Sequence, residues 1–477
     1  MLFADLFFLF AFLPLCFIFY FMFKSIKVKN YVLIVFSLIF YACGEPLKIF
    51  LFLGSALLNY LLALWIDKAR NKPQSKLALA LALIYNIGML GVFKYTDFMI
   101  NNINGLFGTT IPLLKIALPL GISFYTFQIL SYVIDVYWEK VPVQTAFHKL
   151  LLYISLFPQL VAGPIVRYQT IADEIDNRRT TVQDVVEGGI RLIIGLSKKV
   201  LLANNLNVLV GNCFGGNPDL GTLISSDISV TATWIGVIAY SMQVYFDFSG
   251  YSDMAIGIGR IFGFHFDENF RHPFMCRSIS EFWQRWHISL GSFFRDYLLY
   301  IPIFGKRRAV LSLFLVWFTT GLWHGASWNY VIWGLYFGVF IFIETKIGKK
   351  NLKNAPTVLM HIYNKLVILI GFGIFKFENF SDLVVFFKNL VGANGNVLIN
   401  DATITALTGH VYLFIVALIA CFPIVPYLRK RFESSNPLTY SIGMTCATVY
   451  ALVLLFVNTA VLVSTFSSNN PFLYWNF

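Results

Sequence analysis

Long apolar segments follow one another along almost the whole chain of 477 residues. They run over 1–23, 31–66, 77–95, 117–138, 148–166, 229–259, 309–344, 363–375, 409–428 and 440–466. A helix needs about 20 apolar residues to cross a bilayer, whereas charged residues are only 13% of this chain, against roughly a quarter in soluble proteins. The sequence therefore predicts an all-α integral membrane protein, a multi-pass helical bundle.

Two of the segments are too long for one crossing. The 31–66 segment breaks at Gly44-Glu45-Pro46, which predicts a hairpin, and the 309–344 segment is expected to form a hairpin or a re-entrant pair. About 10–13 membrane segments result. Because no soluble stretch is long enough to form a domain of its own, we expect one polytopic unit. It comprises N-terminal spans over 1–138, a core over 139–344 and C-terminal spans over 345–477.

Clusters of lysine and arginine set the expected orientation, because loops rich in them stay in the cytoplasm. Such clusters stand at 24–29, 68–76, 306–308, 346–353 and 429–431. The 31–66 hairpin separates the first two clusters, so both fall on the cytoplasmic side, and both chain termini are expected outside. The first 23 residues lack the basic start and cleavage site of a signal peptide, so we expect them to remain as a helix. The charged segments within 139–308 are expected to form re-entrant or interfacial helices.

The net charge of +12 does not indicate a nucleic-acid partner, since the basic residues stand in short loops rather than on one face. The six cysteines form no CxxC pair, so neither a disulfide framework nor a zinc site is expected. The chain has no nucleotide-binding loop and no metal-ligand spacing. We therefore expect no bound cofactor and no metal; membrane lipid is the partner that the composition requires.

His324 is the first candidate for chemistry. It lies in WFTTGLWHGASWN (317–329), 16 residues after the basic cluster at 306–308, which places it about 24 Å into the membrane if the segment is helical. An ionisable residue at that depth is a functional candidate, and burial favours a neutral imidazole that can accept a proton. Gly321 and Gly325 would permit close approach of a ligand. The alternative is a hydrogen-bonded histidine that helps two helices pack, and the residues alone leave both open.

His287 lies in SISEFWQRWHISLG (278–291), within a longer segment, 267–308, whose seven basic and four acidic residues make it too charged to face lipid. Ser278 and Glu281 have the spacing of a capping box that begins a helix. We expect amphipathic helices that line a cavity or lie at the cytoplasmic interface. His287 could orient a thioester or its pantetheine arm, and Arg285 could bind phosphate. A satisfied interfacial histidine and an ordinary positive-inside arginine are the commoner alternatives.

Two further segments carry polar or helix-breaking residues within apolar sequence. Asp247 and Asp253 in YFDFSGYSDM (245–254) each need a partner. A proton relay or the orientation of a histidine is possible, although a structural bond to arginine, tyrosine or backbone is commoner. Pro158 and Pro164 in 156–167 interrupt a helix, which indicates either a re-entrant segment near a cavity or a simple kink.

In this order, these elements resemble the membrane-bound O-acyltransferase family, and most closely its bacterial branch that acetylates alginate and other extracellular glycans. The similar stretches are FYTFQILSYVIDVY (124–137), FPQLVAGPI (157–165), YFDFSGYSDMAIG (245–257), NFRHPFMCRSISEFWQRWHISL (269–290), GLWHGASWNYVIWG (321–334) and the terminal FLYWNF (472–477). The two motif histidines are 37 residues apart. The resemblance covers nearly the whole chain and is specific for the family rather than for the substrate.

The resemblance implies that His324 is the catalytic histidine and His287 a second functional histidine. It implies a helical bundle around a central tunnel in a bacterial cytoplasmic membrane, with an acyl thioester entering from the cytosol and the acceptor from outside. Residues expected to line the tunnel or contact substrate are Trp323, Trp286, Asp247, Ser249, Arg285 and Asn329. The expected reaction is O-acetylation of an extracytoplasmic polysaccharide (peptidoglycan, alginate or another exopolysaccharide), with acetyl-CoA or another acyl thioester as donor. A separate SGNH-type acetyltransferase is the expected protein partner.

Three alternatives stay open. The teichoic acid D-alanyl branch of the same family takes its acyl group from a carrier protein, but it is usually shorter than this chain. A transporter or export channel without chemistry would be expected to show repeated halves, and none is found. A scaffold for a glycan synthase is disfavoured because both motif histidines are present.

Overall fold

Helices joined by loops make up the described part of the chain. The computed structural model describes residues 2–216, 221–300, 308–433 and 437–465, and within them β-pairing is limited to an isolated bridge between Gly215 and Ile224. Within these described residues, seven helices are long and apolar enough to cross a membrane, and Phe8–Met22 and Ala309–His324 are shorter apolar helices. The prediction of an all-α multi-pass membrane protein is confirmed.

The chain divides into two compact units, and the long helix α13 (Val230–Ile261) contributes to both. Among the described residues, the first unit contains 2–196, 251–268 and 462–465. Its helices are η1 (Phe8–Phe12), α1 (Leu13–Met22), α2 (Ile26–Gly44), α3 (Lys48–Lys68), α4 (Pro73–Leu90), η2 (Gly91–Tyr95), α5 (Thr96–Phe107), α6 (Ile122–Tyr137), α7 (Phe147–Ser155), α8 (Phe157–Leu160), α9 (Tyr168–Ile171), α10 (Glu174–Asn177) and α11 (Val182–Ser197).

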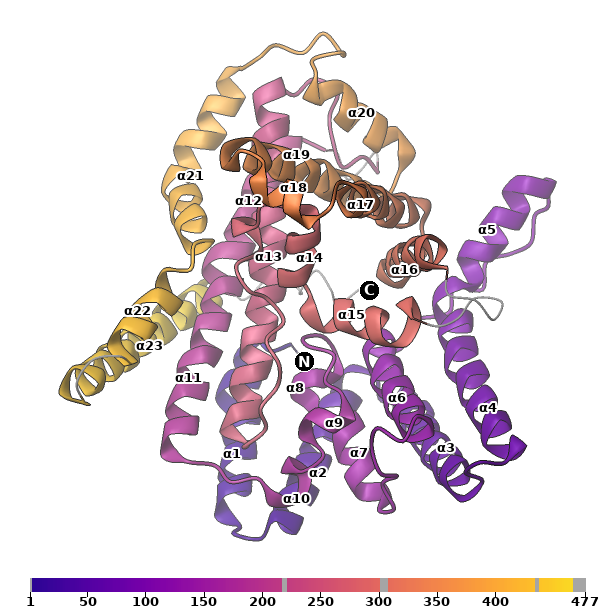
Figure 1. Cartoon of the computed structure of the whole chain (residues 1–477). Coiled ribbons are helices and arrows are strands. Elements are labelled where there is room, and N and C mark those ends of the chain that lie inside the picture. The colour runs from indigo at the N-terminus through magenta and orange to yellow at the C-terminus, as the bar shows by residue number, and fades with distance from the viewer. Residues whose placement is uncertain (1, 217–220, 301–307, 434–436, 466–477) are drawn as a thin grey trace. The chain divides into compact units, whose positions relative to one another are not determined.

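In the first unit, α2 packs against α1 and α7, and α3, α4 and α6 pack against one another (Figure 1). The expected hairpin at 31–66 is confirmed, because α2 ends at Gly44 and α3 begins at Lys48. The expected segment at 77–95 is part of a longer helix. Residues Pro73–Phe107 run as 35 helical residues, about 52 Å at 1.5 Å per residue, which exceeds the roughly 30 Å of the hydrocarbon core. No residue of α5 is buried.

The second unit contains residues 197–250 and 269–461. Besides the N-terminal part of α13, its helices are η3 (Lys198–Ala203), α12 (Asn204–Phe214), η5 (Pro273–Met275), α14 (Ile279–Arg285), α15 (Ile288–Phe294), η6 (Arg295–Leu299), α16 (Ala309–His324), α17 (Trp328–Ile347), α18 (Lys349–Asn354), α19 (Thr357–Lys376), α20 (Phe380–Leu390), α21 (Asp401–Ala420), α22 (Ile424–Glu433) and α23 (Pro437–Ser464).

Some expected boundaries in this half of the chain differ from the observed ones. The segment expected at 409–428 begins eight residues earlier, because α21 runs from Asp401 to Ala420, and α22 then starts separately at Ile424. The side chain of Asn400 accepts a hydrogen bond from the amide of Thr403 and so caps α21 within a polar stretch that hydropathy alone does not mark. Lys306, Arg307 and the terminal FLYWNF lie outside the described residues. The division at 138 and 344 stays a prediction.

The expected hairpin at 309–344 is formed by α16 and α17, whose backbones approach closely at glycines. A Cβ atom built on Gly321 would lie 2.3 Å from the carbonyl oxygen of Tyr330, and one on Gly334 would lie 2.2 Å from that of Trp317. Only glycine fits both positions. In a membrane, where lipid is as apolar as the helix surface, such close backbone packing is a main source of helix association. The glycines therefore fix where α16 ends, and His324 with it.

We expect Gly334→Ala to lower the melting temperature of the detergent-solubilised protein by several degrees, since overpacking costs about 1–3 kcal/mol. The measurement is thermal unfolding, with the folded fraction at each temperature determined by size-exclusion chromatography. Gly409→Ala in α21 is the matched control, because a Cβ there has nothing within 4 Å and alanine favours a helix. Equal melting temperatures for Gly334→Ala and the wild type would show that the α16–α17 contact does not limit stability.

Candidate functional site

His324 is the last residue of α16, and its position follows from the way that helix ends. Gly325 has an extended backbone with φ −174°, and α17 starts at Trp328, so the chain reverses within three residues. His324 is only 2% exposed. The expectation of a deeply buried histidine in this motif agrees with that value.

Aromatic rings surround His324. The ring centroids of Trp333, Trp323 and Phe375 lie 4.8, 5.0 and 5.3 Å from the imidazole centroid, and all three rings stand edge-to-face against it. These rings come from α16, α17 and α19, so the environment is built by three helices. A dry, low-dielectric surrounding of this kind strengthens any electrostatic interaction that a substrate makes with the imidazole.

His287 lies between α14 and α15, as the N-cap of α15, and is also 2% exposed. Its backbone has φ 46°, a left-handed conformation that is uncommon outside glycine. The ring stands edge-on to Phe248 at 4.7 Å and lies 5.7 Å from Trp323. The two motif histidines are 37 residues apart in sequence, yet both imidazoles lie beside the indole of Trp323.

Asn269 holds His287, and the sequence analysis did not identify it. Its Oδ1 atom lies 3.1 Å from Nδ1 of His287, and it also accepts hydrogen bonds from the Oγ and the backbone N–H of Ser289 at 2.9 and 3.3 Å. The amide of Ile288 donates to the Asn269 carbonyl at 3.0 Å. The only available signal was that Asn269 begins the NFRHPF stretch that precedes the histidine motif.

The other ring nitrogen of His287, Nε2, is buried and makes no hydrogen bond within the described part of the chain. His287 lies outside the helices long enough to span the membrane, and burial lowers the pKa of its imidazole to about 3. The imidazole is therefore neutral near pH 7 and can accept a proton or a hydrogen bond.

The acidic residues of the third motif have the partners that their burial requires. Asp247 accepts a hydrogen bond from Lys199 at 2.6 Å, with both side chains almost fully buried. Lys199 stands in the π-helical segment η3, and the sequence analysis expected arginine, tyrosine or backbone instead of lysine. Asp253 pairs with Arg191 at 2.8 Å, as expected of an arginine, and Arg191 also binds Glu268. The imidazole of His287 is hydrogen-bonded to Asn269 and lies within reach of Ser289, rather than meeting an aspartate.

The remaining predicted site residues are buried or half-buried, and most of them have partners of their own. Trp286 is buried in a second aromatic cluster with Phe282 and Phe372. Arg285 is engaged by Glu281 one turn earlier at 2.5 Å. Ser249 is buried, and its Oγ has no partner among the described residues. Asn329 donates to the carbonyls of Ile374 and Phe375, which ties α17 to the end of α19 beside His324.

Three expectations about the backbone can be compared with the structure. A Cβ at Gly325 would meet the ring of Tyr330 at 2.2 Å, so α17 fills the space on that side of the glycine, and close approach of a ligand at Gly321 and Gly325 stays a prediction. The helix at 156–167 is broken, since α8 is only four residues long and is followed by non-helical, buried chain. The capping box is confirmed at Ser278, which accepts from the amide of Glu281.

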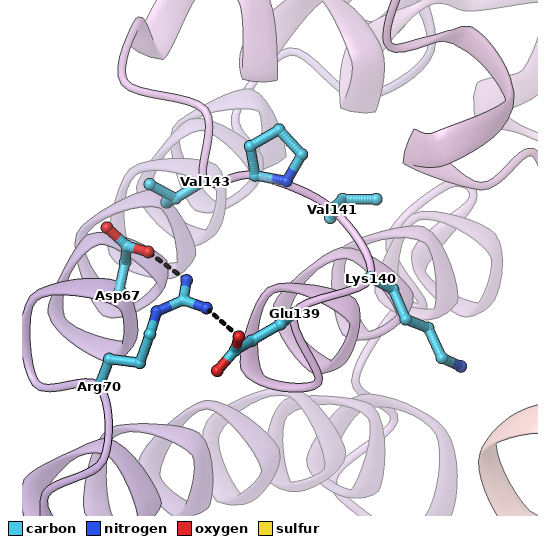
Figure 2. Close-up of a pocket in the computed structure, with 7 residues that line it drawn as sticks. Asp67, Arg70, Glu139, Lys140, Val141 and Val143 are labelled. Atoms are coloured by element: carbon cyan, nitrogen blue, oxygen red, sulfur yellow. Dashed lines mark hydrogen bonds and ion pairs between the residues drawn. The ribbon is translucent and has the colours of Figure 1, made fainter.

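A separate pocket lies in the first unit, at the end of α3 (Figure 2). It measures about 440 Å³ and is lined by Asp67, Arg70, Glu139, Lys140, Val141, Pro142 and Val143. Arg70 pairs with Asp67 and with Glu139, the latter at 3.1 Å, so these charges satisfy one another. None of the predicted site residues lines this pocket. Within the described residues no group of three or more His, Cys, Asp or Glu could hold a metal.

Comparison with known proteins gives a consistent result. The model of the membrane-bound O-acyltransferase family matches residues 139–379. A probable alginate O-acetylase of Pseudomonas putida is 35% identical over the full length of both chains. The peptidoglycan O-acetyltransferase of Helicobacter pylori is 34% identical over 81% of this chain and 79% of its own.

A relative that matches less of the chain is named for a third activity. The teichoic acid D-alanyltransferase of Bacillus subtilis is 31% identical over 55% of this chain and 68% of its own. The family match spans both motif histidines, His287 and His324, together with Asn269. This protein belongs to the membrane-bound O-acyltransferase family and is an O-acyltransferase of the multi-pass membrane type.

Proposed function

We propose that this enzyme takes an acetyl group from a cytoplasmic thioester and passes it through the membrane for O-acetylation of an extracytoplasmic polysaccharide. The observation that carries the proposal is the convergence of His287 and His324 on Trp323. Two buried imidazoles on separate helical segments, gathered about one indole, are more than helix packing requires. Relatives named as alginate and peptidoglycan O-acetyltransferases support the acetyl group and the polysaccharide.

In the proposed reaction His324 is the general base. Its imidazole removes the proton from the acceptor hydroxyl as the oxygen attacks the thioester carbonyl, so a carbon–oxygen bond forms. The carbon–sulfur bond then breaks, and the imidazolium returns the proton to the leaving thiolate. An ester and a free thiol result, and no oxidant or reductant is needed. Holding both substrates at one place can lower the barrier by roughly 7–11 kcal/mol.

The location of His324 suits a reaction between two compartments. Thioesters are made in the cytosol, whereas the polysaccharide is outside. A reactive imidazole within a tight aromatic wall allows an acyl group to cross while bulk water is excluded. Because His324 is 2% exposed, the proposal requires the rings around it to admit substrate from both sides, and the family's tunnel stays a prediction here.

The remaining assignments follow from the same scheme. The loops rich in lysine and arginine would face the cytosol, which puts the N-terminus outside and the protein in a bacterial cytoplasmic membrane. The C-terminus falls outside the described residues. Acetyl-CoA is the proposed donor, with no bound cofactor. A separate extracytoplasmic transferase of the SGNH type would receive the acetyl group and deliver it to the glycan. Trp323, Ser249 and Asn329 are proposed to contact substrate.

D-Alanyl transfer is the second candidate, because one relative carries out that reaction on teichoic acid. That match covers 55% of this chain, whereas the relative named as an alginate O-acetylase matches along its full length. The longer match favours acetyl transfer.

We expect His324→Ala to reduce acyl transfer by at least about 100-fold, the lower bound of what a general base contributes. The measurement is transfer of labelled acetyl from acetyl-CoA across proteoliposomes that contain the full chain, at matched protein levels. His410→Ala is the control, because the ring nitrogen of His410 makes its hydrogen bond within its own helix, α21. Retained turnover in His324→Ala at normal membrane levels would end the assignment of this residue as the base.

The donor can be identified in the same proteoliposomes. We expect label to leave acetyl-CoA enclosed in the vesicle and to appear as an O-acetyl ester on a polysaccharide added outside, because a small thioester can reach a buried imidazole without a docking protein. A carrier protein loaded with D-alanine should give no transfer. Transfer from the loaded carrier, with none from acetyl-CoA, would assign the chain to D-alanyl chemistry.

A further inference from the structure

The tautomer of His287 is determined by its neighbours. The backbone N–H of Ser289 can only donate, and it points at the side-chain amide of Asn269. The atom that faces it must therefore be the oxygen Oδ1, because the NH₂ group would oppose donor to donor. The Oγ–H of Ser289 donates to the same oxygen at 2.9 Å. The two donors of Ser289 thus determine the orientation of the Asn269 amide.

The same oxygen lies 3.1 Å from Nδ1 of His287. An amide oxygen only accepts, so Nδ1 must carry the hydrogen. In a neutral imidazole the other nitrogen then has a lone pair and no hydrogen. That nitrogen, Nε2, is buried without a partner among the described residues. A buried acceptor without a donor is destabilising, so this site favours a ligand that donates a hydrogen bond to Nε2.

We propose that Asn269 is a positioning residue that holds His287 in the Nδ1–H tautomer, so that Nε2 meets the substrate as a hydrogen-bond acceptor. The proposal rests on the proposed function for what the substrate is. An amide N–H of the pantetheine arm of a thioester fits this acceptor, whereas a developing oxyanion does not, because Nε2 has no hydrogen to donate. His287 would then bind the donor while His324 removes the proton of the acceptor.

The charged groups near His287 are paired with one another, so burial is the main influence on its protonation. On α13, Asp247 is ion-paired with Lys199 at 2.6 Å. On α14, Arg285 is paired with Glu281. His324 is the titratable group at this end of α16, and Arg271, close to Asn269 in sequence, is exposed. None of these places an unpaired carboxylate beside the imidazole, so a carboxylate introduced there has a clear effect.

Asn269→Asp is the sharpest variant. A carboxylate keeps every hydrogen bond that Oδ1 accepts, so the loop retains its shape, but it favours the imidazolium and raises the pKa of His287 by roughly 1–3 units. A protonated Nε2 donates and cannot accept. KM for the thioester should therefore begin to rise at a higher pH than in the wild type, whereas the acid limb of kcat, which depends on protonation of His324, should stay in place. A purely structural asparagine would lower activity equally at all pH values.

Asn389→Asp is the matched control. Asn389 is buried, donates to the carbonyl of Ser225 and accepts from Asn394 and Asn396, so the same change tests the cost of a buried carboxylate elsewhere. Its pH profile should keep the wild-type shape. If Asn269→Asp shows the same profile as Asn389→Asp, Asn269 does not act through His287 and the proposal is overturned.

The tautomer itself is measured without any assay of transfer. The full chain labelled with ¹⁵N-histidine, in lipid nanodiscs, should show a protonated Nδ1 and an unprotonated Nε2 for the signal that disappears in His287→Gln. Asn269→Leu should give a second population with the hydrogen on Nε2. A wild-type spectrum with Nε2–H overturns the inference. The predicted spectrum together with absent acyl transfer would instead overturn the proposed function and leave the tautomer in place.

Discussion

The close contact between the backbones of α16 and α17 is the interaction on which the site depends. Lipid offers no hydrophobic gain for bringing two apolar helices together, so their association comes from packing at short range. Gly321 and Gly334 permit it, and the turn that joins the helices presents His324 at its tip. α19 then supplies Phe375 to the same imidazole, tied in place by Asn329. The imidazole of His324 is thus held by three packed helices rather than by a loop.

The second histidine is held in a different way. His287 lies in a left-handed backbone conformation between two seven-residue helices, where helical hydrogen bonds cannot fix it. Hydrogen bonds from the segment at Asn269 do so instead. Glu344 of α17 accepts from the amides of Ile279 and Ser280 and so anchors α14 to the helix pair that carries His324. One carboxylate therefore links the supports of both imidazoles.

Much of this arrangement could be predicted from the sequence. Apolar length gives the helical membrane class, the break at Gly44-Glu45-Pro46 gives a hairpin, and the motifs give both histidines. Hydropathy could not give the true start of α21, because the side chain of Asn400 begins that helix within polar sequence. It also could not identify Asn269 or Lys199. Their importance comes from contacts across 18 and 48 positions of sequence, and no local pattern reports such pairing. The sequence also does not say what fills the space beside a glycine, which at Gly321 and Gly325 is Tyr330 of α17.

The ion pair between Lys199 and Asp247 also limits how this sequence can change over time. The two charges cancel, and each is almost fully removed from water. Losing one leaves the other buried and uncompensated, at a cost of roughly 3–5 kcal/mol, whereas replacing both by apolar residues of similar volume is often nearly neutral. A lineage can therefore exchange the pair only by altering both codons together or by passing through a poorly folding intermediate. Positions 199 and 247 should therefore covary among homologous sequences, even where both motif histidines are unchanged.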